Sequence, residues 1–214
     1  MSQEEVKAFQ RSILGWYRVN KRDYLPWRIN REQAITPYEI FVSEIMLQQT
    51  QVSRVLEKYP QFLRAFPTIQ HLASSPLSRV LRTWQGMGYN RRALFMKSAA
   101  EEIIRHWGGV IPSDPALLQK LPGVGPYTAG AIACFAYNKP VLFLDTNIRK
   151  VFLHYFFGAN NRRLRVDDRE ILGIAAKALF KRDPRRWHYA LMDYGALVLA
   201  RKPGLLKKSR HYHK

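Results

Sequence analysis

The chain has 214 residues, and its 35 Lys and Arg against 16 Asp and Glu give a formal net charge of +19. No run of about 18 apolar residues is present, so the composition excludes a membrane span. A single cysteine, Cys134, excludes an internal disulfide and a cysteine-held iron–sulfur cluster, and it fits a reducing cytoplasm.

So large a basic excess favours a polyanionic partner, above all nucleic acid. A generically basic cytosolic protein is the alternative. The length predicts one or two domains with enough chain to bury a core. The polar, acidic start Met1–Glu5 does not have the character of a signal peptide, so we expect a cytoplasmic location, at the nucleoid in a bacterium.

Apolar residues recur with a helical period along most of the chain. The first such stretches are Tyr38–Phe66 and Arg92–Trp107, and Gly108-Gly109 ends the second one. Ser113-Asp114-Pro115 is typical of a helix start. Later stretches with the same period are Tyr127–Ala136, Ile148–Tyr155, Arg169–Phe180 and Trp187–Leu199. Pro140–Leu144 comes nearest to a strand and is short, so we predict an all-α fold.

The run Leu121–Thr128, Leu-Pro-Gly-Val-Gly-Pro-Tyr-Thr, is a helix-hairpin-helix signature between two helical stretches. Gly123 and Gly125 permit positive φ and a close approach to the backbone. Amides at such a helix start can hold a nucleic-acid phosphate without reading the base sequence. The predicted phosphate-binding residues are Leu121, Gly123, Val124, Gly125 and Thr128. An ordinary helix connection that contains glycines is the alternative.

Two carboxylates are candidates for chemistry. Glu44 follows Ile40 by four residues and precedes Leu47 by three, which places it on an apolar helix face. Desolvation there favours the neutral form that a general acid needs, whereas a partly exposed or Arg-paired Glu is the alternative. Asp145, in Phe-Leu-Asp-Thr-Asn, is well suited to cap a helix, but its place shortly after the hairpin favours chemistry on the bound strand.

Two further segments suit contact with an unstacked base. The uncharged polar residues Gln48–Gln51 can reach base edges. The segment Trp84–Tyr89 supplies glycines and aromatic rings, a combination that can wedge or stack beside an extruded base. For Trp84 we expect core packing, and for Tyr89, which follows two glycines, we expect the wedge role.

Taken together, these motifs resemble the helix-hairpin-helix/Gly-Pro-Asp superfamily of DNA glycosylases, most closely the catalytic domain of MutY-type adenine DNA glycosylases. The matching segments stand in the family's order over residues 8–200. They are Leu25–Arg28, Ser43–Val52, Trp84–Tyr89, Leu121–Ile132, Leu144–Val151 and Ala190–Ala196.

The resemblance implies that residues 1–214 form one catalytic unit with two helical lobes and the active site in the cleft between them. Residues 30–137 would form a six-helix barrel that contains the hairpin. Residues 1–29 with 138–214 would form the second lobe, which ends in a basic tail over 201–214. The expected partner is double-stranded DNA with a mismatch or lesion, bound by a monomer.

The resemblance also assigns roles to single residues. Glu44 protonates the leaving base, Asp145 stabilises the oxocarbenium-like sugar, and Tyr127 and Asn147 organise the site. The base must be flipped out of the duplex before the bond is accessible. The residues that would line the base pocket or enter the helix are Trp27, Arg28, Leu47, Gln48, Tyr89 and Tyr189.

Tyr127 stands where related bifunctional glycosylase/lyases carry a lysine. Without that amine no Schiff base forms, so we expect base excision without efficient strand cleavage. A thymine glycosylase that acts on T/G mismatches shares this tyrosine, and Tyr189 stands where adenine-specific members usually carry Glu or Gln. The identity of the excised base therefore stays open.

The family's cluster cysteines would align near Leu199, Leu206, Ser209 and a point past the last residue. We therefore expect no iron–sulfur cluster, no other metal ligand set and no cofactor, although the resemblance allows a structural cation at the hairpin. The basic tail contains no acid, and we expect it to supply backbone electrostatics in place of the cluster loop. Its basic residues are Arg201, Lys202, Lys207, Lys208, Arg210 and Lys214, of which we predict phosphate contacts for Lys207, Lys208 and Arg210.

We also expect the chain to lack the C-terminal domain with which the family recognises 8-oxoguanine. The leading hypothesis is a monofunctional glycosylase that removes adenine opposite guanine or 8-oxoguanine. Removal of thymine or uracil opposite guanine is the alternative within the class. An inactive DNA-structure-binding protein is the alternative of another class, and a sequence-specific regulator is weaker because the hairpin carries no base code.

Overall fold

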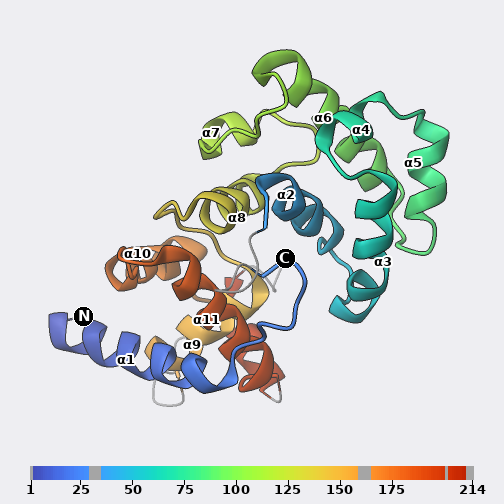
Figure 1. The fold of residues 1–214 in the computed structure, drawn as a ribbon. Helices are drawn as coiled ribbons and strands as arrows, with labels where there is room; N and C mark the ends of the chain where they lie inside the picture. Colours follow the sequence, from blue (N-terminus) through green and yellow to red (C-terminus); the bar gives the residue numbers. More distant parts are fainter. Residues whose placement is uncertain (1, 29–34, 159–164, 201, 211–214) are drawn as a thin grey trace. The chain divides into compact units, whose positions relative to one another are not determined.

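The computed structural model describes residues 2–28, 35–158, 165–200 and 202–210. Over these residues the regular elements are helices, as predicted, and the β contact is an isolated bridge between Val166 and Ser209 (Figure 1). None of the described helices combines the length and the apolar character that a membrane crossing requires. The chain divides into two compact units. We call Asp23–Tyr137 the central unit, and Met1–Arg22 with Asn138–Lys214 the terminal unit.

The central unit is built around one short, almost wholly buried helix, α2 (Pro37–Met46). It packs against α3 (Val52–Ala65), α6 (Arg91–Trp107) and α8 (Pro126–Tyr137). The remaining helices are α4 (Ile69–Ser74), α5 (Leu77–Trp84) and α7 (Pro115–Leu118). The small side chains of α8 let it lie close to α2, because three of its eight consecutive buried residues are Ala and a fourth is Gly.

The stretch Tyr38–Phe66, which has one helical period in the sequence, forms two helices in the structure. The break occupies residues 47–51, where Gln49 adopts a φ of 53°. Such a left-handed conformation cannot continue a right-handed helix. The period therefore predicted the helical state correctly and missed the loop within it.

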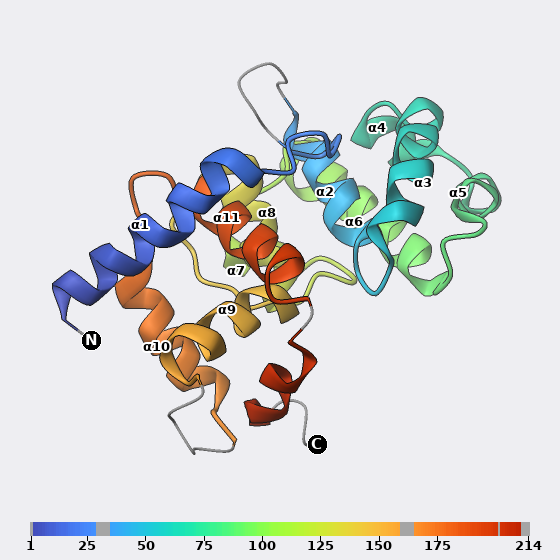
Figure 2. The same ribbon diagram turned by 90° about the horizontal axis from the view of Figure 1, so that it is seen from below.

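The terminal unit consists of α1 (Gln3–Asn20), α9 (Thr146–Phe156), α10 (Asp168–Ala178), α11 (Pro184–Leu197) and the 3₁₀ helix η1 (Pro203–Lys208). In this unit α11 packs against both α1 and α9, and η1 packs against α9 (Figure 2). Phe9 of α1 packs against both α9 and α11. Its ring meets Phe152 of α9 and Trp187 of α11 edge-on, with ring centroids 5.6 and 5.5 Å apart. We did not expect α1, although Ser2 and Glu5 form a capping box at its start.

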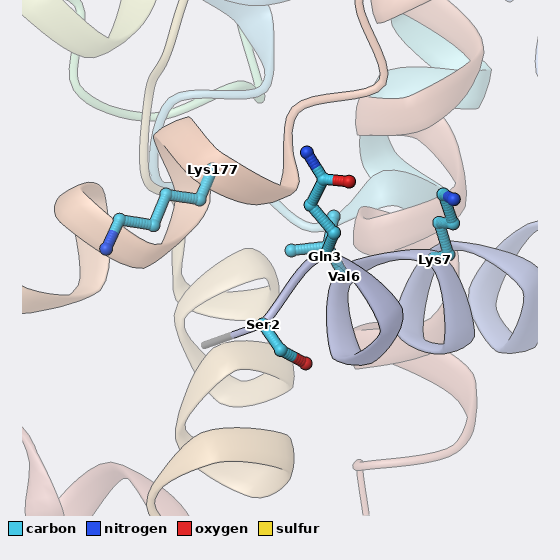
Figure 3. A pocket seen from close by; sticks show the side chains of 5 residues that line it. All are labelled: Ser2, Gln3, Val6, Lys7 and Lys177. Atoms are coloured by element: carbon cyan, nitrogen blue, oxygen red, sulfur yellow. The ribbon is translucent and has the colours of Figure 1, made fainter.

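The start of α1 and the end of α10 flank a hollow of about 360 Å³ in the terminal unit (Figure 3). Its lining residues are Ser2, Gln3, Val6, Lys7 and Lys177. None of the site residues predicted from the sequence lines it, so we assign the chemistry elsewhere.

Candidate active site

Glu44 lies in the middle of α2, the most buried helix of the central unit. A capping box between Thr36 and Glu39 begins the helix, and Pro37 occupies its first turn. Glu44 is 5% exposed, so the expected burial is confirmed and the partly exposed alternative is wrong. Removing a carboxyl from water is unfavourable unless it gains partners in the protein. The general-acid role that the resemblance gives Glu44 stays a prediction.

The loop that follows α2 is tied to the hairpin. The Gln48 amide nitrogen donates to the Gly123 carbonyl at 3.2 Å and to the Thr128 hydroxyl at 3.0 Å. Thr128, a predicted phosphate ligand, is itself buried. Leu47, a predicted pocket residue, is the C-cap of α2. Entry of Gln48 into a duplex therefore requires these two hydrogen bonds to open.

The hairpin turn uses two of its own amides. The N–H of Leu121 donates to the Leu118 carbonyl at 3.1 Å, and that of Val124 donates to the Leu121 carbonyl at 3.2 Å. Both side chains are buried. The amides of Gly123 and Gly125 have no acceptor among the described residues. These two donors are therefore the ones available for a phosphate.

The two hairpin glycines differ in their local structure. Gly123 has a φ of 75°, and a Cβ atom there would lie 2.7 Å from Cβ of Phe95. Gly125 has no positive φ, and a Cβ atom there would meet nothing within 4 Å. The positive φ that glycine permits is therefore used at Gly123, whereas Gly125 leaves open space for a close approach to its backbone.

The predicted pocket residues of the central unit differ in exposure. Trp27 and Arg28 are each 4% exposed, and the Trp27 ring meets Tyr59 edge-on at 5.6 Å. Tyr127, in place of the lyase lysine, lies half-buried in the first turn of α8. The roles that the resemblance gives these residues stay predictions.

Trp84 and Tyr89 bear out the contrast expected between them. Trp84 is fully buried, and its indole N–H donates to the Gly88 carbonyl at 3.0 Å. Tyr89 is 65% exposed and has a φ of 46°. A bulky residue in the left-handed region is strained, and such strain gathers at functional sites. Trp84 is therefore a core residue, whereas Tyr89 is exposed and its wedge role stays a prediction.

Asp145 of the terminal unit caps the start of α9. Its Oδ1 accepts the Ile148 N–H at 2.6 Å, and its Oδ2 accepts the Asn147 side-chain amide at 3.1 Å. Burial raises the pKa of Asp145, and these donors together with the charge of Arg149 partly oppose the shift. The capping alternative is therefore present in the structure, and the same two hydrogen bonds hold the Asp145 carboxyl group in one orientation. The catalytic role that the resemblance gives Asp145 stays a prediction.

Gly195 of α11 makes room for the start of α9. A Cβ atom at Gly195 would lie 2.3 Å from the backbone oxygen of Asn147. The sequence placed Gly195 in a matching segment but gave it no role.

Tyr189, on the same helix, is 4% exposed, and its neighbour His188 stacks on Phe143 with ring centroids 4.3 Å apart. Burial lowers the pKa of His188 to about 4, so this imidazole is neutral at physiological pH.

The basic tail docks on the terminal unit through hydrogen bonds. The Lys208 ammonium donates to the carbonyls of Phe157 and Gly158 at 2.7 and 2.8 Å, which closes the end of α9. The Val166 N–H donates to the Lys208 carbonyl at 2.7 Å, and the Val166 carbonyl accepts the Arg210 N–H at 2.9 Å. Lys208 is therefore used inside the protein, whereas Lys207 and Arg210 are exposed. Arg201 and residues 211–214 lie outside the described residues.

The residues at the positions expected for cluster cysteines do not suit an iron–sulfur cluster. Leu199 and Ser209 are fully buried, and Leu206 is half-buried. Cys134, the one cysteine of the sequence, is buried in α8 of the central unit. A cluster needs several thiolates, so this donor set does not fit it. Across the described residues, no group of three His, Cys, Asp or Glu could hold a metal ion.

Arg92 is the polar residue that the sequence analysis missed. It lies in α6, is 8% exposed, and donates hydrogen bonds to the loop after α2, at Gln48, and to the loop after α5, at Gly88. The signal was its place on the apolar face that Met96, Ala99 and Ile103 continue. Arg91, one position earlier, is exposed.

The described residues form helices around a glycine hairpin, an arrangement typical of helix-hairpin-helix proteins. Residues 42–170 match the family described as "HhH-GPD superfamily base excision DNA repair protein", and the chain belongs to this family.

Named relatives agree with this family. Adenine DNA glycosylase of Mycobacterium tuberculosis is 39% identical over 193 residues, which cover 90% of this chain and 62% of that protein. Adenine DNA glycosylase of Homo sapiens is 38% identical over 200 residues, which cover 91% of this chain and 36% of that protein. The chain thus spans less than two thirds of the length of these curated relatives. A solved thermostable thymine-DNA glycosylase is similar with a TM-score of 0.80 and 28% identity, over 98% of this chain and 97% of its own.

Proposed function

We propose that this protein is a monofunctional DNA glycosylase that removes adenine opposite guanine or 8-oxoguanine. The observation that carries the proposal is Glu44, a carboxyl buried on the apolar helix α2, in a chain 39% identical to an adenine DNA glycosylase over 193 residues. We further propose that it acts as a monomer in the cytoplasm, without a metal or cofactor.

The proposed reaction breaks the N-glycosidic bond of a nucleotide flipped out of the duplex. Glu44 donates its proton to the adenine ring, and the bonding electron pair leaves with the base. Asp145 stabilises the positive charge on the sugar, and water then adds at the anomeric carbon and gives up a proton. The hydrogen bonds from Ile148 and Asn147 hold the Asp145 carboxylate in one orientation for this role.

Double-stranded DNA is the proposed partner. The hairpin amides of Gly123 and Gly125 offer two donors at the start of α8, and the net charge of +19 attracts the phosphate backbone. Exposed Tyr89 is the proposed wedge at the site of base extrusion. These contacts hold the strand without selecting a sequence, which suits an enzyme that searches for mismatches.

Thymine or uracil opposite guanine is the second candidate substrate. Tyr189 stands where adenine-specific relatives usually carry Glu or Gln. The solved thymine-DNA glycosylase also matches the chain over nearly the full length of both. A pyrimidine leaves more readily without protonation than a purine does, so dependence on Glu44 separates the two candidates.

A panel of duplexes tests the proposal, with A·G, A·8-oxoguanine, T·G and U·G pairs incubated with the protein. Mass spectrometry identifies the released base, and gels with and without alkali show the strand. We expect free adenine and a strand that breaks only after alkali. Because the phenol of Tyr127 forms no Schiff base, borohydride should trap little covalent complex. Binding without release of any base would show an inactive DNA-structure-binding protein instead.

A further inference from the structure

The Arg92 guanidinium is the most heavily bonded side chain described in the central unit. Its Nη1 donates to main-chain carbonyls at 3.2, 3.0 and 2.5 Å, which belong to Ile45, Met46 and Gln48. Its Nη2 donates at 2.9, 3.2 and 3.1 Å to the Thr50 hydroxyl and to the carbonyls of Met87 and Gly88. One rigid planar group therefore ties the end of α2 to a second loop.

The two segments joined in this way are loop 47–51 and loop 85–90. Each contains a non-glycine residue in the left-handed region, Gln49 with a φ of 53° and Tyr89 with a φ of 46°. Only two other described non-glycine residues have a positive φ. Strained conformations persist only where the surroundings over-determine them. Four of the six hydrogen bonds from Arg92 reach these loops, two in each, and supply that constraint.

Arg92 also fixes the exposed ring of Tyr89. The centre of its guanidinium lies 5.6 Å from the Tyr89 ring centroid and 5.2 Å from the Trp84 ring centroid. Its own backbone N–H donates to the Tyr89 carbonyl at 2.9 Å. A cation held against a ring face attracts it, so the buried arginine restrains a side chain that is itself open to solvent.

The side chains predicted to enter the duplex, Gln48 and Tyr89, thus come from two loops held by the same buried group. We propose that Arg92 is a positioning residue for base extrusion, which keeps loop 47–51 and loop 85–90 in one fixed arrangement. This inference rests on the proposed function, because extrusion matters only for an enzyme that acts on a flipped base. Arg92 is buried, so it assists without contacting a phosphate.

The test compares Arg92→Lys with Thr50→Val, which removes a single acceptor from the network. The matched control is Arg105→Lys on the same helix, whose exposed side chain pairs with Glu102 at 2.7 Å. Fluorescence of 2-aminopurine at the target position reports extrusion without any need for turnover. Release rates are measured on a mismatched duplex and on one whose target base faces an abasic site and is already unstacked. Thermal melting and the salt dependence of binding complete the set.

We expect Arg92→Lys to lower extrusion and release on the mismatched duplex at least about tenfold, because several charge-assisted hydrogen bonds are lost. On the unpaired target the loss should be much smaller, and the salt dependence should not change. Thr50→Val should show the same pattern more weakly with normal melting, and Arg105→Lys should match the wild type. Equal losses on both duplexes, or normal extrusion by Arg92→Lys, would overturn the inference.

The same measurements separate this inference from the proposed function. A wild-type protein that extrudes 2-aminopurine but releases no base would refute the glycosylase proposal and still test Arg92. A wild-type protein that releases base while the Arg92 and Thr50 variants extrude normally would refute the Arg92 inference alone. Absence of extrusion by the wild type would refute both.

Discussion

The two units hold their candidate catalytic carboxylates in opposite ways. In the central unit, Glu44 lies in the middle of a buried helix that already has its own cap at Thr36. In the terminal unit, Asp145 is itself the cap of α9. The carboxyl at position 145 supplies the helix start, whereas the helix that carries Glu44 begins without it. The two carboxylates therefore differ in their position within the element, one in the middle of a helix and the other at its start.

Asp145→Asn separates the two roles of that position. Asparagine caps a helix about as well as aspartate, so the start of α9 should survive. Loss of the negative charge should slow base release by about a thousandfold or more, because nothing then balances the cationic sugar. Single-turnover kinetics measure the rate, and duplex affinity should stay within a few-fold. Near-normal turnover would leave Asp145 with its capping role alone.

Glu44→Gln tests the proposed general acid. Release of adenine should fall by about a hundredfold to ten-thousandfold, the range for loss of a general acid. The measurement is the single-turnover rate on A·G and T·G duplexes in parallel. If the variant still releases thymine but no longer releases adenine, the proton of Glu44 is needed only for a purine leaving group. An unchanged adenine rate would remove Glu44 from the mechanism.

Gly195→Ala tests how α11 sets the position of the α9 start. The new methyl group would lie 2.3 Å from the Asn147 oxygen, and we expect a loss of stability of about 1–3 kcal/mol together with slower base release. The matched control is Gly173→Ala in α10, where a Cβ atom meets nothing within 4 Å. The control should gain about 0.5–1 kcal/mol in stability. Calorimetry and single-turnover rates check both variants. Equal behaviour of the two variants would show that the close approach at Gly195 has no consequence.

Lys208→Met and Lys207→Met test the other end of α9. Lys208 donates to the carbonyls of Phe157 and Gly158, so its loss should lower stability by about 1–2 kcal/mol and leave the salt dependence of binding unchanged. Lys207 is exposed, and its loss should reduce the slope of log affinity against log salt by about 0.9. A stability loss for Lys207→Met and a reduced salt slope for Lys208→Met would show that Lys207 holds the fold and that Lys208 contacts DNA.

The parts of this account that the sequence predicted rest on local signals. The helical period predicted the all-α fold, and the Gly123 turn predicted the hairpin because its conformation depends on neighbouring residues. Loop 47–51 was missed, since the group that holds it, Arg92, comes from a helix far along the chain. The contact at Gly195 and the use of Lys208 were missed for the same reason: each partner is distant in sequence.

If the charge of Asp145 serves chemistry and not folding, the unfolding free energies of the wild type and of Asp145→Asn, measured across pH, should show it. Burial raises the pKa of this carboxyl above its ordinary value of 3.8. Its stabilising contribution is therefore complete below that value and is lost as pH rises through the folded-state pKa. We expect Asp145→Asn to be at least as stable as the wild type at neutral pH, with any gain in unfolding free energy shrinking towards acid pH. A variant that is less stable than the wild type at neutral pH, with the gap narrowing in acid, would show instead that the fold needs the charge.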